Sequence, residues 1–193
     1  MDGEGPLVGQ GERTFGPSAL FTPANVVTGA RLVVSPMLWA AIIAWGAGWG
    51  TFSIWATLTA TDAADGWVAR RQGTTRSGAF LDPLADKALV LGGLVALAVI
   101  GRFWWLPVGL IALREIAVSI WRTVWGRRGV SLPASTMAKW KTALQSSAVG
   151  AAVFPLLADD PAWPADVLLI VALVFTVISG AQYLTARIDA REV

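Results

Sequence analysis

The sequence predicts an all-α integral membrane protein with six transmembrane helices, and three observations lead to that prediction. Hydrophobic residues make up 55% of the 193 residues and charged residues only 15%, against roughly 25% charged residues in soluble domains. Apolar segments recur six times, each near the ~20 residues that a helix needs to cross a bilayer. The chain also contains 11 Trp, a residue that favours the headgroup boundary.

The predicted elements follow one another with short linkers. Residues 1–17 are Gly-rich and polar and predict a flexible cytoplasmic tail, and Ser18–Thr22 predicts a short interfacial segment. The spans are expected at about Ala24–Trp45, Thr51–Arg70, Phe80–Ile100, Trp104–Trp125, Met137–Leu157 and Trp163–Thr185. The linkers, such as GAGWG and GRRGVSLPAS, have turn-like compositions. No internal repeat divides the chain, so residues 18–193 are expected to form a single membrane domain.

The charges outside the spans predict the orientation. One side of the predicted bundle carries most of the basic residues, and the other carries one Arg and an acidic cluster. The first set is Arg13, Arg70, Arg71, Arg76, Arg127, Arg128, Lys139, Arg187 and Arg191, and the second is Arg102, Asp159, Asp160 and Asp166. Because basic residues concentrate on the cytoplasmic side, both termini are predicted to be cytoplasmic. An even number of spans agrees, and the prediction is a multi-pass protein of the plasma membrane.

The absence of two residue types narrows the chemistry. The chain has no Cys and no His, so neither a thiolate nor an imidazole can act as a ligand or a base. Carboxylates must supply these roles, and oxygen ligands suit hard cations such as Mg²⁺. The net charge of +2 is too small to indicate binding to nucleic acid.

Ionisable residues within the spans are costly and indicate function. Asp62 and Asp65 are three residues apart and share one helix face. The small residues Gly66 and Ala69 fall on the same face, which leaves space for a ligand. In the next span Gly78, Asp82 and Asp86 form a second stripe, at intervals of four residues.

Antiparallel neighbouring spans would bring the two stripes together. Four facing carboxylates would repel each other in a low dielectric, so cations must neutralise them. Two divalent ions would do so and suit in-line displacement at phosphorus. Two other interpretations stay open from the residues alone: Asp82 before Pro83 could be a helix N-cap, and Asp62 with Asp65 could form a relay in an ion-coupled transporter.

The two stripes together resemble a known signature. The pattern Asp62-x-x-Asp65-Gly66-x-x-Ala69-Arg70, followed by Gly78-x-x-x-Asp82-x-x-x-Asp86, is similar to that of the CDP-alcohol phosphatidyltransferases. The loop between Arg70 and Gly78 is about one residue shorter than usual. Members move a phosphatidyl group from a CDP-linked lipid to an alcohol and release CMP. Six spans with cytoplasmic termini fit that family, and its members are often homodimers.

The resemblance implies roles for individual residues. Asp62, Asp65 and Asp82 would bind two divalent cations, Mg²⁺ or Mn²⁺, and Asp86 would complete the metal shell and act as the base on the acceptor hydroxyl. A second group would shape the site for CDP-diacylglycerol at the cytoplasmic side of the membrane. That group comprises Gly66, Ala69, Arg70 and Gly78, with Asn25, Thr28 and Arg31 from TPANVVTGAR, which resembles the family's lipid-nucleotide entry segment.

The acceptor is predicted from the fourth and fifth spans. LREIAVSIWR and AKWKTALQ resemble the members that use sn-glycerol 3-phosphate, whose phosphate needs fixed positive charge. Four residues could supply that charge: Arg114, Arg122, Lys139 and Lys141. Glu115 lies between the two Arg as an orienting partner, and snorkelling to the interface is the alternative for the two Lys. Phosphatidylglycerol and inositol phosphate are the alternative acceptors, and membrane lipids are expected partners.

Overall fold

The computed structural model describes residues 23–72, 78–126, 136–158 and 162–189. Within these ranges the regular structure consists of six α-helices. They are α1 (Pro23–Trp45), α2 (Trp49–Gln72), α3 (Gly78–Val99), α4 (Trp105–Gly126), α5 (Thr136–Val153) and α6 (Trp163–Asp189). The prediction of six helices is therefore confirmed. The predicted tail, residues 1–17, and the interfacial segment Ser18–Thr22 lie outside the described residues.

Local sequence explains where three of the helices end. Gly46 and Gly101 have φ angles of 67° and 75°, a backbone region that Gly adopts without strain at a helix C-terminus. The Gly46 N–H donates to the carbonyl of Ile42, 2.9 Å away, and so terminates α1. Helix α5 ends at Val153, four residues before the predicted Leu157. The prediction overran because Pro155 cannot continue a helix and also restricts the residue before it.

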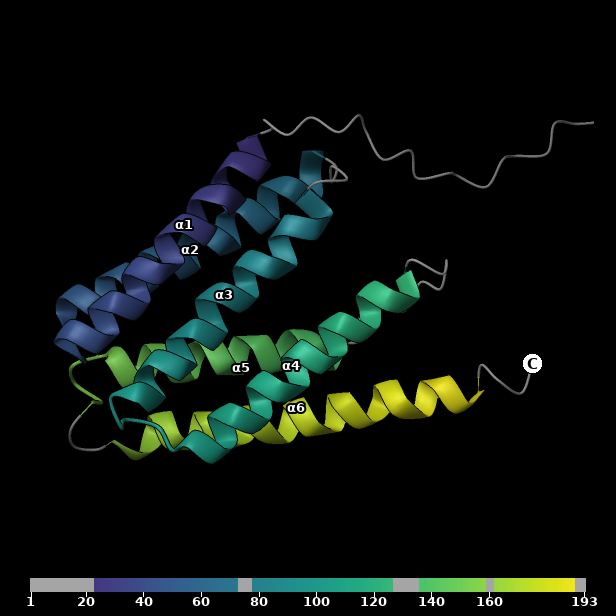
Figure 1. Ribbon diagram of the computed structural model, residues 1–193. Helices are drawn as coiled ribbons and strands as arrows, with labels where there is room; N and C mark the ends of the chain where they lie inside the picture. The colour runs from purple at the N-terminus through teal and green to yellow at the C-terminus, as the bar shows by residue number, and fades with distance from the viewer. Residues whose placement is uncertain (1–22, 73–77, 127–135, 159–161, 190–193) are drawn as a thin grey trace, which may run out of the picture.

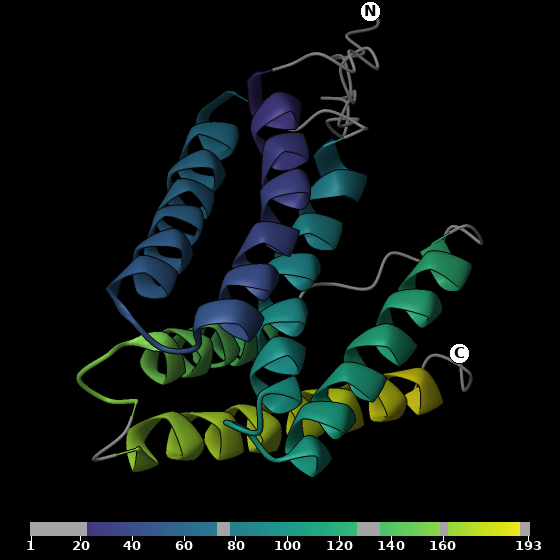
Figure 2. The ribbon, with the colours of Figure 1, turned by 60° about the vertical axis from the view of Figure 1, so that its left-hand side comes forward.

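Helices α1, α2 and α3 form one group, α5 and α6 form a second, and α4 lies between α3 and α6. The axes of α1, α2 and α3 lie roughly side by side with the chain reversing from one helix to the next, and α1 packs on both of the others. Helices α5 and α6 pack side by side and cross beneath that group (Figure 1 and Figure 2). Helix α4 contacts both α3 and α6. The side chains of α3, α4, α5 and α6 therefore meet near the centre of the molecule.

The core is apolar and closely packed. Leu38 and Ile42 of α1, Leu94 and Leu97 of α3, and Ile111 of α4 are fully buried. Glycines allow close approach between helices at two contacts with α5. A Cβ added at Gly93 would lie 3.1 Å from Val149, and one added at Gly150 would lie 2.4 Å from the ring of Trp55. Glycine at these positions thus brings α2 and α3 close to α5.

Large apolar side chains also cover much of the outer surface. Val33, Met37, Leu113 and Ile120 are each at least 60% exposed, and so is Trp104. Among the described residues, one helix segment is long and apolar enough by length and composition to cross a membrane, the 19 residues Trp163–Ala181. Shorter apolar stretches occupy Gly29–Trp45 and Lys87–Val99. Soluble proteins rarely expose so much contiguous apolar surface, so these faces favour a lipid environment.

An ion pair and a hydrogen bond join the turn after α3 to the start of α6. Arg102 follows α3 and donates from one guanidinium nitrogen to Asp166 Oδ1 at 2.9 Å, and from the other to the Ala162 carbonyl at 2.8 Å. The α3–α4 turn and the start of α6 therefore lie together. The charge pattern predicts this, because it places Arg102 and Asp166 on the same side of the membrane.

We predict that Gly150→Ala lowers the free energy of unfolding by about 1–3 kcal/mol, the usual effect of overpacking. The added methyl group would displace Trp55, which packs on Phe52 with ring centroids 5.5 Å apart. Thermal unfolding followed by circular dichroism in detergent measures the change. Gly109→Ala is the control, because no atom lies within 4 Å of a Cβ there, and it should be neutral or gain up to about 1 kcal/mol. Equal effects of both substitutions would contradict the packing argument.

Candidate functional site

The first predicted site residues that the structure brings together are Arg31 of α1 and Asp62 of α2. A guanidinium nitrogen of Arg31 pairs with Asp62 Oδ1. Arg31 is buried, whereas the side chain of Asp62 is 41% exposed. Arg31 lies 14 residues before the end of α1 and Asp62 lies 13 residues after the start of α2, so the two stand at the same depth in this antiparallel pair. The ion pair fixes one carboxylate of the predicted metal set.

For the other motif residues the structure gives the helix to which each belongs but not the position of its side chain. Asn25 and Thr28 belong to α1, Asp65, Gly66, Ala69 and Arg70 to α2, and Gly78, Asp82 and Asp86 to α3. Their side chains, with those of Arg122 and Lys139, lie outside the described residues. Helix α3 begins at Gly78, four positions before Asp82, so the interpretation of Asp82 as an N-cap is wrong. Among the side chains that the structure describes, no group of three His, Cys, Asp or Glu could hold a metal ion.

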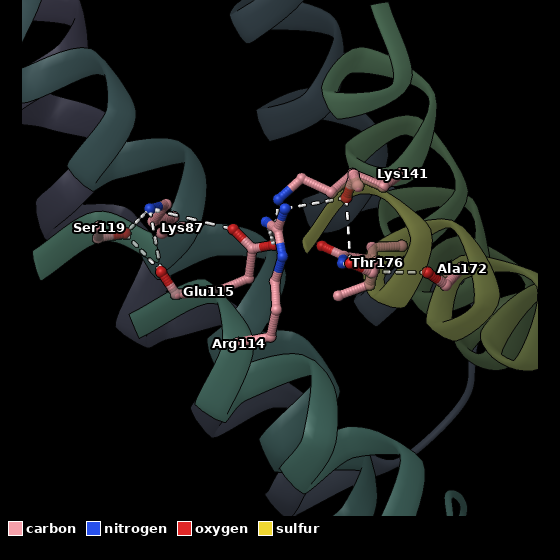
Figure 3. Close-up of polar contacts among 9 residues, drawn as sticks. Lys87, Arg114, Glu115, Ser119, Lys141, Ala172 and Thr176 are labelled. Atoms are coloured by element: carbon pink, nitrogen blue, oxygen red, sulfur yellow. Dashed lines mark hydrogen bonds and ion pairs between the residues drawn. The ribbon is translucent and has the colours of Figure 1, made fainter. Parts of the chain in front are cut away.

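A buried polar cluster surrounds the carboxylate of Glu115 in α4, which is 5% exposed. Arg114 donates to its Oε1 at 2.8 Å. Lys141 of α5, itself 6% exposed, also donates to Oε1. Lys87 of α3 lies on the other side of the carboxylate, 4.0 Å from Oε2. Figure 3 shows Lys87 on one side of Glu115, and Arg114 with Lys141 on the other.

Side chains of α6 and α4 complete this cluster. Arg114 donates from its second terminal nitrogen to Ser179 Oγ at 2.9 Å. The missing side chain of Gly180 leaves room for the guanidinium, because a Cβ there would lie 3.3 Å from Arg114 Nε. On the other side, Lys87 donates to Ser119 and to the Glu115 carbonyl, 3.5 Å away (Figure 3). Four helices therefore contribute to one polar cluster in an otherwise apolar core.

A second polar contact adjoins the cluster. Gln145, one turn after Lys141 on α5, donates to Thr176 Oγ1 at 3.0 Å. The Thr176 hydroxyl donates in turn to the Ala172 carbonyl, one turn earlier in α6. Because these buried groups satisfy each other, they hold α5 against α6 and fix the depth at which Lys141 leaves α5.

The cluster gathers several positive charges. Among the side chains that the structure describes, Lys87, Arg114 and Lys141 all lie within ion-pair distance of the Glu115 carboxylate. Positive charge held in a low dielectric attracts an anion more strongly than the same charge in water. Arg114 and Lys141, two of the four residues expected to bind the acceptor phosphate, contact the same carboxylate oxygen of Glu115. The arrangement is suited to binding a phosphate.

Sequence reasoning did not include several members of this cluster among the site residues. Lys87 is an ionisable residue within a span, which is itself a signal of function. Glu115 and Ser119 are four residues apart and so share a face of α4. Once Glu115 is recognised as a site residue, this spacing points to Ser119 as a neighbour. Ser179 and Thr176 carry no such signal, because hydroxyl residues are ordinary in packed membrane helices.

Comparison with known proteins identifies the class. A sequence model of the CDP-alcohol phosphatidyltransferase family matches residues 21–178, and the chain therefore belongs to this family. A probable phosphatidylglycerophosphate synthase of Mycobacterium tuberculosis is 39% identical over 169 residues, which cover 83% of this chain and 78% of the relative. The CDP-diacylglycerol–glycerol-3-phosphate 3-phosphatidyltransferase of Yersinia enterocolitica is 39% identical over 159 residues, covering 78% and 81%. The predicted resemblance, and with it the prediction of an enzyme of phosphatidyl transfer, is confirmed.

We predict that Glu115→Leu lowers the free energy of unfolding by about 3–5 kcal/mol, because it leaves buried cations without their anion. For a chain of this size the fall in Tm would be on the order of 10 °C, measured by circular dichroism in detergent. Asp166→Leu is the matched control. It removes the carboxylate of an ion pair in which the Asp166 side chain is 53% exposed. The free energy of unfolding should therefore fall by about 1 kcal/mol or less. A Tm for Glu115→Leu no lower than that of Asp166→Leu would refute the central role of Glu115.

Proposed function

We propose that the protein transfers the phosphatidyl group of CDP-diacylglycerol to sn-glycerol 3-phosphate and so forms phosphatidylglycerophosphate and CMP. The observation that carries the choice of acceptor is the pair of cationic side chains, Arg114 and Lys141, that meet in the interior at one oxygen of Glu115 in a chain of this family. An acceptor with its own phosphate needs such a site. The names of the Mycobacterium and Yersinia relatives support the same acceptor.

Asp62, Asp65, Asp82 and Asp86 are proposed to hold two divalent cations, Mg²⁺ or Mn²⁺. Carboxylate oxygens are the ligands that these hard cations prefer. Asp62 fits this role, because Arg31 contacts Oδ1 and a carboxylate has a second oxygen that can accept a cation. When bound, the cations would neutralise the diphosphate and stabilise the leaving CMP.

The residues of the chain supply the remaining steps. Gly66, Ala69, Arg70 and Gly78 shape the CDP site, with Asn25, Thr28 and Arg31 at its entry. Arg114 and Lys141, with Arg122 and Lys139, bind the phosphate of the acceptor and aim its hydroxyl. Asp86 takes the hydroxyl proton while the oxygen attacks the phosphatidyl phosphorus. One P–O bond forms, the P–O bond to CMP breaks, and CMP leaves as an anion.

The proposal includes a membrane arrangement. Six spans with both termini in the cytoplasm, in the plasma membrane, would place the substrate sites on the cytoplasmic side. The outward apolar side chains of α1 and α4 support membrane embedding, and the positive-inside rule supports the orientation. Soluble glycerol 3-phosphate and membrane-held CDP-diacylglycerol would then meet at one surface.

The first functional prediction concerns the reaction itself. Purified protein with CDP-diacylglycerol and Mg²⁺ or Mn²⁺ should release CMP when sn-glycerol 3-phosphate is added. EDTA should stop the release and excess cation should restore it. Asp86→Asn should lower turnover by about 10²–10⁴-fold, the usual contribution of a general base, without changing the circular dichroism spectrum. CMP is measured by chromatography.

Three controls make that experiment decisive. Asp166→Asn changes a carboxylate at the opposite end of the bundle and should keep normal turnover. Phosphatidylglycerol and inositol phosphate replace the acceptor in parallel reactions. Release of CMP with either of these but not with glycerol 3-phosphate would change the acceptor, and the absence of metal-dependent CMP release with all three would favour the ion-coupled transporter.

The second functional prediction concerns the acceptor phosphate. Lys141→Met should raise the KM for glycerol 3-phosphate on the order of tenfold or more, the loss of one charge-assisted hydrogen bond. The KM for CDP-diacylglycerol should stay within about twofold, since uniform damage to both substrates indicates a structural effect. Gln145→Met is the control, because Gln145 is buried on the same helix and contacts Thr176 rather than Glu115. If it raises the glycerol 3-phosphate KM equally, Lys141 does not bind the phosphate.

A further inference from the structure

An apolar groove of about 390 Å³ lies between α3 and α4. Its walls come from Leu91 and Ala88 of α3 and from Ile116 and Ile120 of α4, and Trp39 of α1 also lines it. The two Ile are 54% and 60% exposed, so the groove opens on the outer surface. Volumes of this size lie within the range of small-molecule sites.

One end of the groove is cationic. Lys87 and Ser119 line it there, on the Oε2 side of Glu115 and away from Arg114 and Lys141 (Figure 3). The Lys87 side chain remains 34% exposed. In the sequence of α3, Asp82 and Asp86 precede Lys87, and the residues that follow Lys87 up to Val99 are apolar. The ammonium group therefore stands where polar and apolar surfaces of α3 meet, with the apolar groove extending from it.

Trp39 adds a buried hydrogen-bond donor to the lining of the groove. The indole of Trp39 rests on Gly92, where an added Cβ would be 2.1 Å from Nε1. Trp39 Nε1 is buried and has no acceptor among the described residues. A buried donor without a partner is costly, so its position points to an acceptor that a ligand brings. Gly92 is five residues beyond Lys87, or about 7.5 Å along the helix axis.

The groove lies on a different face of α3 from the predicted carboxylate stripe. Positions 82 and 86 share one face, and position 87 is turned about 100° from position 86. Positions 87 and 91 continue along that second face. The groove is thus separate from the proposed metal and CDP sites, even though Lys87 follows Asp86 directly in sequence.

We propose that this groove binds an anionic glycerophospholipid of the bilayer, distinct from the substrate. One acyl chain lies against Leu91, Ile116 and Ile120, and the lipid phosphate contacts Lys87. An ester carbonyl, which lies deeper than the phosphate in such a lipid, accepts from Trp39 Nε1. Charge complementarity selects an anionic headgroup over a zwitterionic one, and the apolar walls select an acyl chain over a soluble anion.

The test is native mass spectrometry of the purified full chain in detergent, with dioleoylphosphatidylglycerol and dioleoylphosphatidylcholine added in equal amounts. The wild type should retain one phosphatidylglycerol with about fivefold preference, the effect expected of one basic residue near an anionic lipid. Ala88→Trp, which fills the groove, should lose this lipid. Lys87→Gln should retain one lipid without the preference for phosphatidylglycerol.

Ala117→Trp is the matched control, because Ala117 is exposed on α4 and does not line the groove; it should bind as the wild type does. Equal retention by Ala88→Trp and Ala117→Trp would overturn the proposal, and so would no preference in the wild type. Displacement of the bound lipid by one equivalent of CDP-diacylglycerol would assign the groove to the substrate instead. A dimer mass lost in Ala88→Trp, with no lipid bound to the wild type, would assign it to a second copy. None of these readouts depends on CMP release.

Discussion

Glu115 places one carboxylate among three cations that come from α3, α4 and α5, and Arg114 extends the contact to α6. Buried charges in a low dielectric interact strongly only when they are paired and hydrogen-bonded. The carboxylate therefore constrains the relative rotation of these helices, because each cation must reach it from its own helix. The apolar contacts around it are less directional and can accommodate small shifts. The position of the proposed acceptor site follows from this constraint.

The two oxygens of Glu115 face different surroundings. Oε1 accepts from Arg114 and Lys141, toward the proposed acceptor site, and Oε2 faces Lys87 at the groove. A single side chain thus lies between the proposed site for a soluble phosphate and the proposed lipid groove. It contacts two cationic side chains on the first side and one on the second.

Much of the fold and part of the site could be predicted from sequence, for identifiable reasons. Helix number follows from the repetition of apolar segments, and Gly46, Gly101 and Pro155 mark ends that local chemistry decides. Family membership follows from the spacing of the four Asp, which is a local pattern. The pairing of Lys87 with Ser119, or of Arg114 with Ser179, depends on the rotation of each helix about its axis. Apolar segments that are hydrophobic all round do not specify this rotation, so sequence reasoning could propose a cationic cluster with Glu115 as a partner but not the contacts with Ser119 and Ser179.

The ion pair between Arg31 and Asp62 has a consequence for how the protein is made. A lone Asp or Arg near the centre of a membrane helix costs about 2.5–3.5 kcal/mol during insertion by the translocon. Because Arg31 and Asp62 stand at similar depth in consecutive helices, the proposed membrane arrangement lets α1 and α2 enter the bilayer as a hairpin in which these two charges compensate each other. The partner that neutralises Asp62 during biogenesis is thus encoded in the chain itself and does not have to be a metal ion.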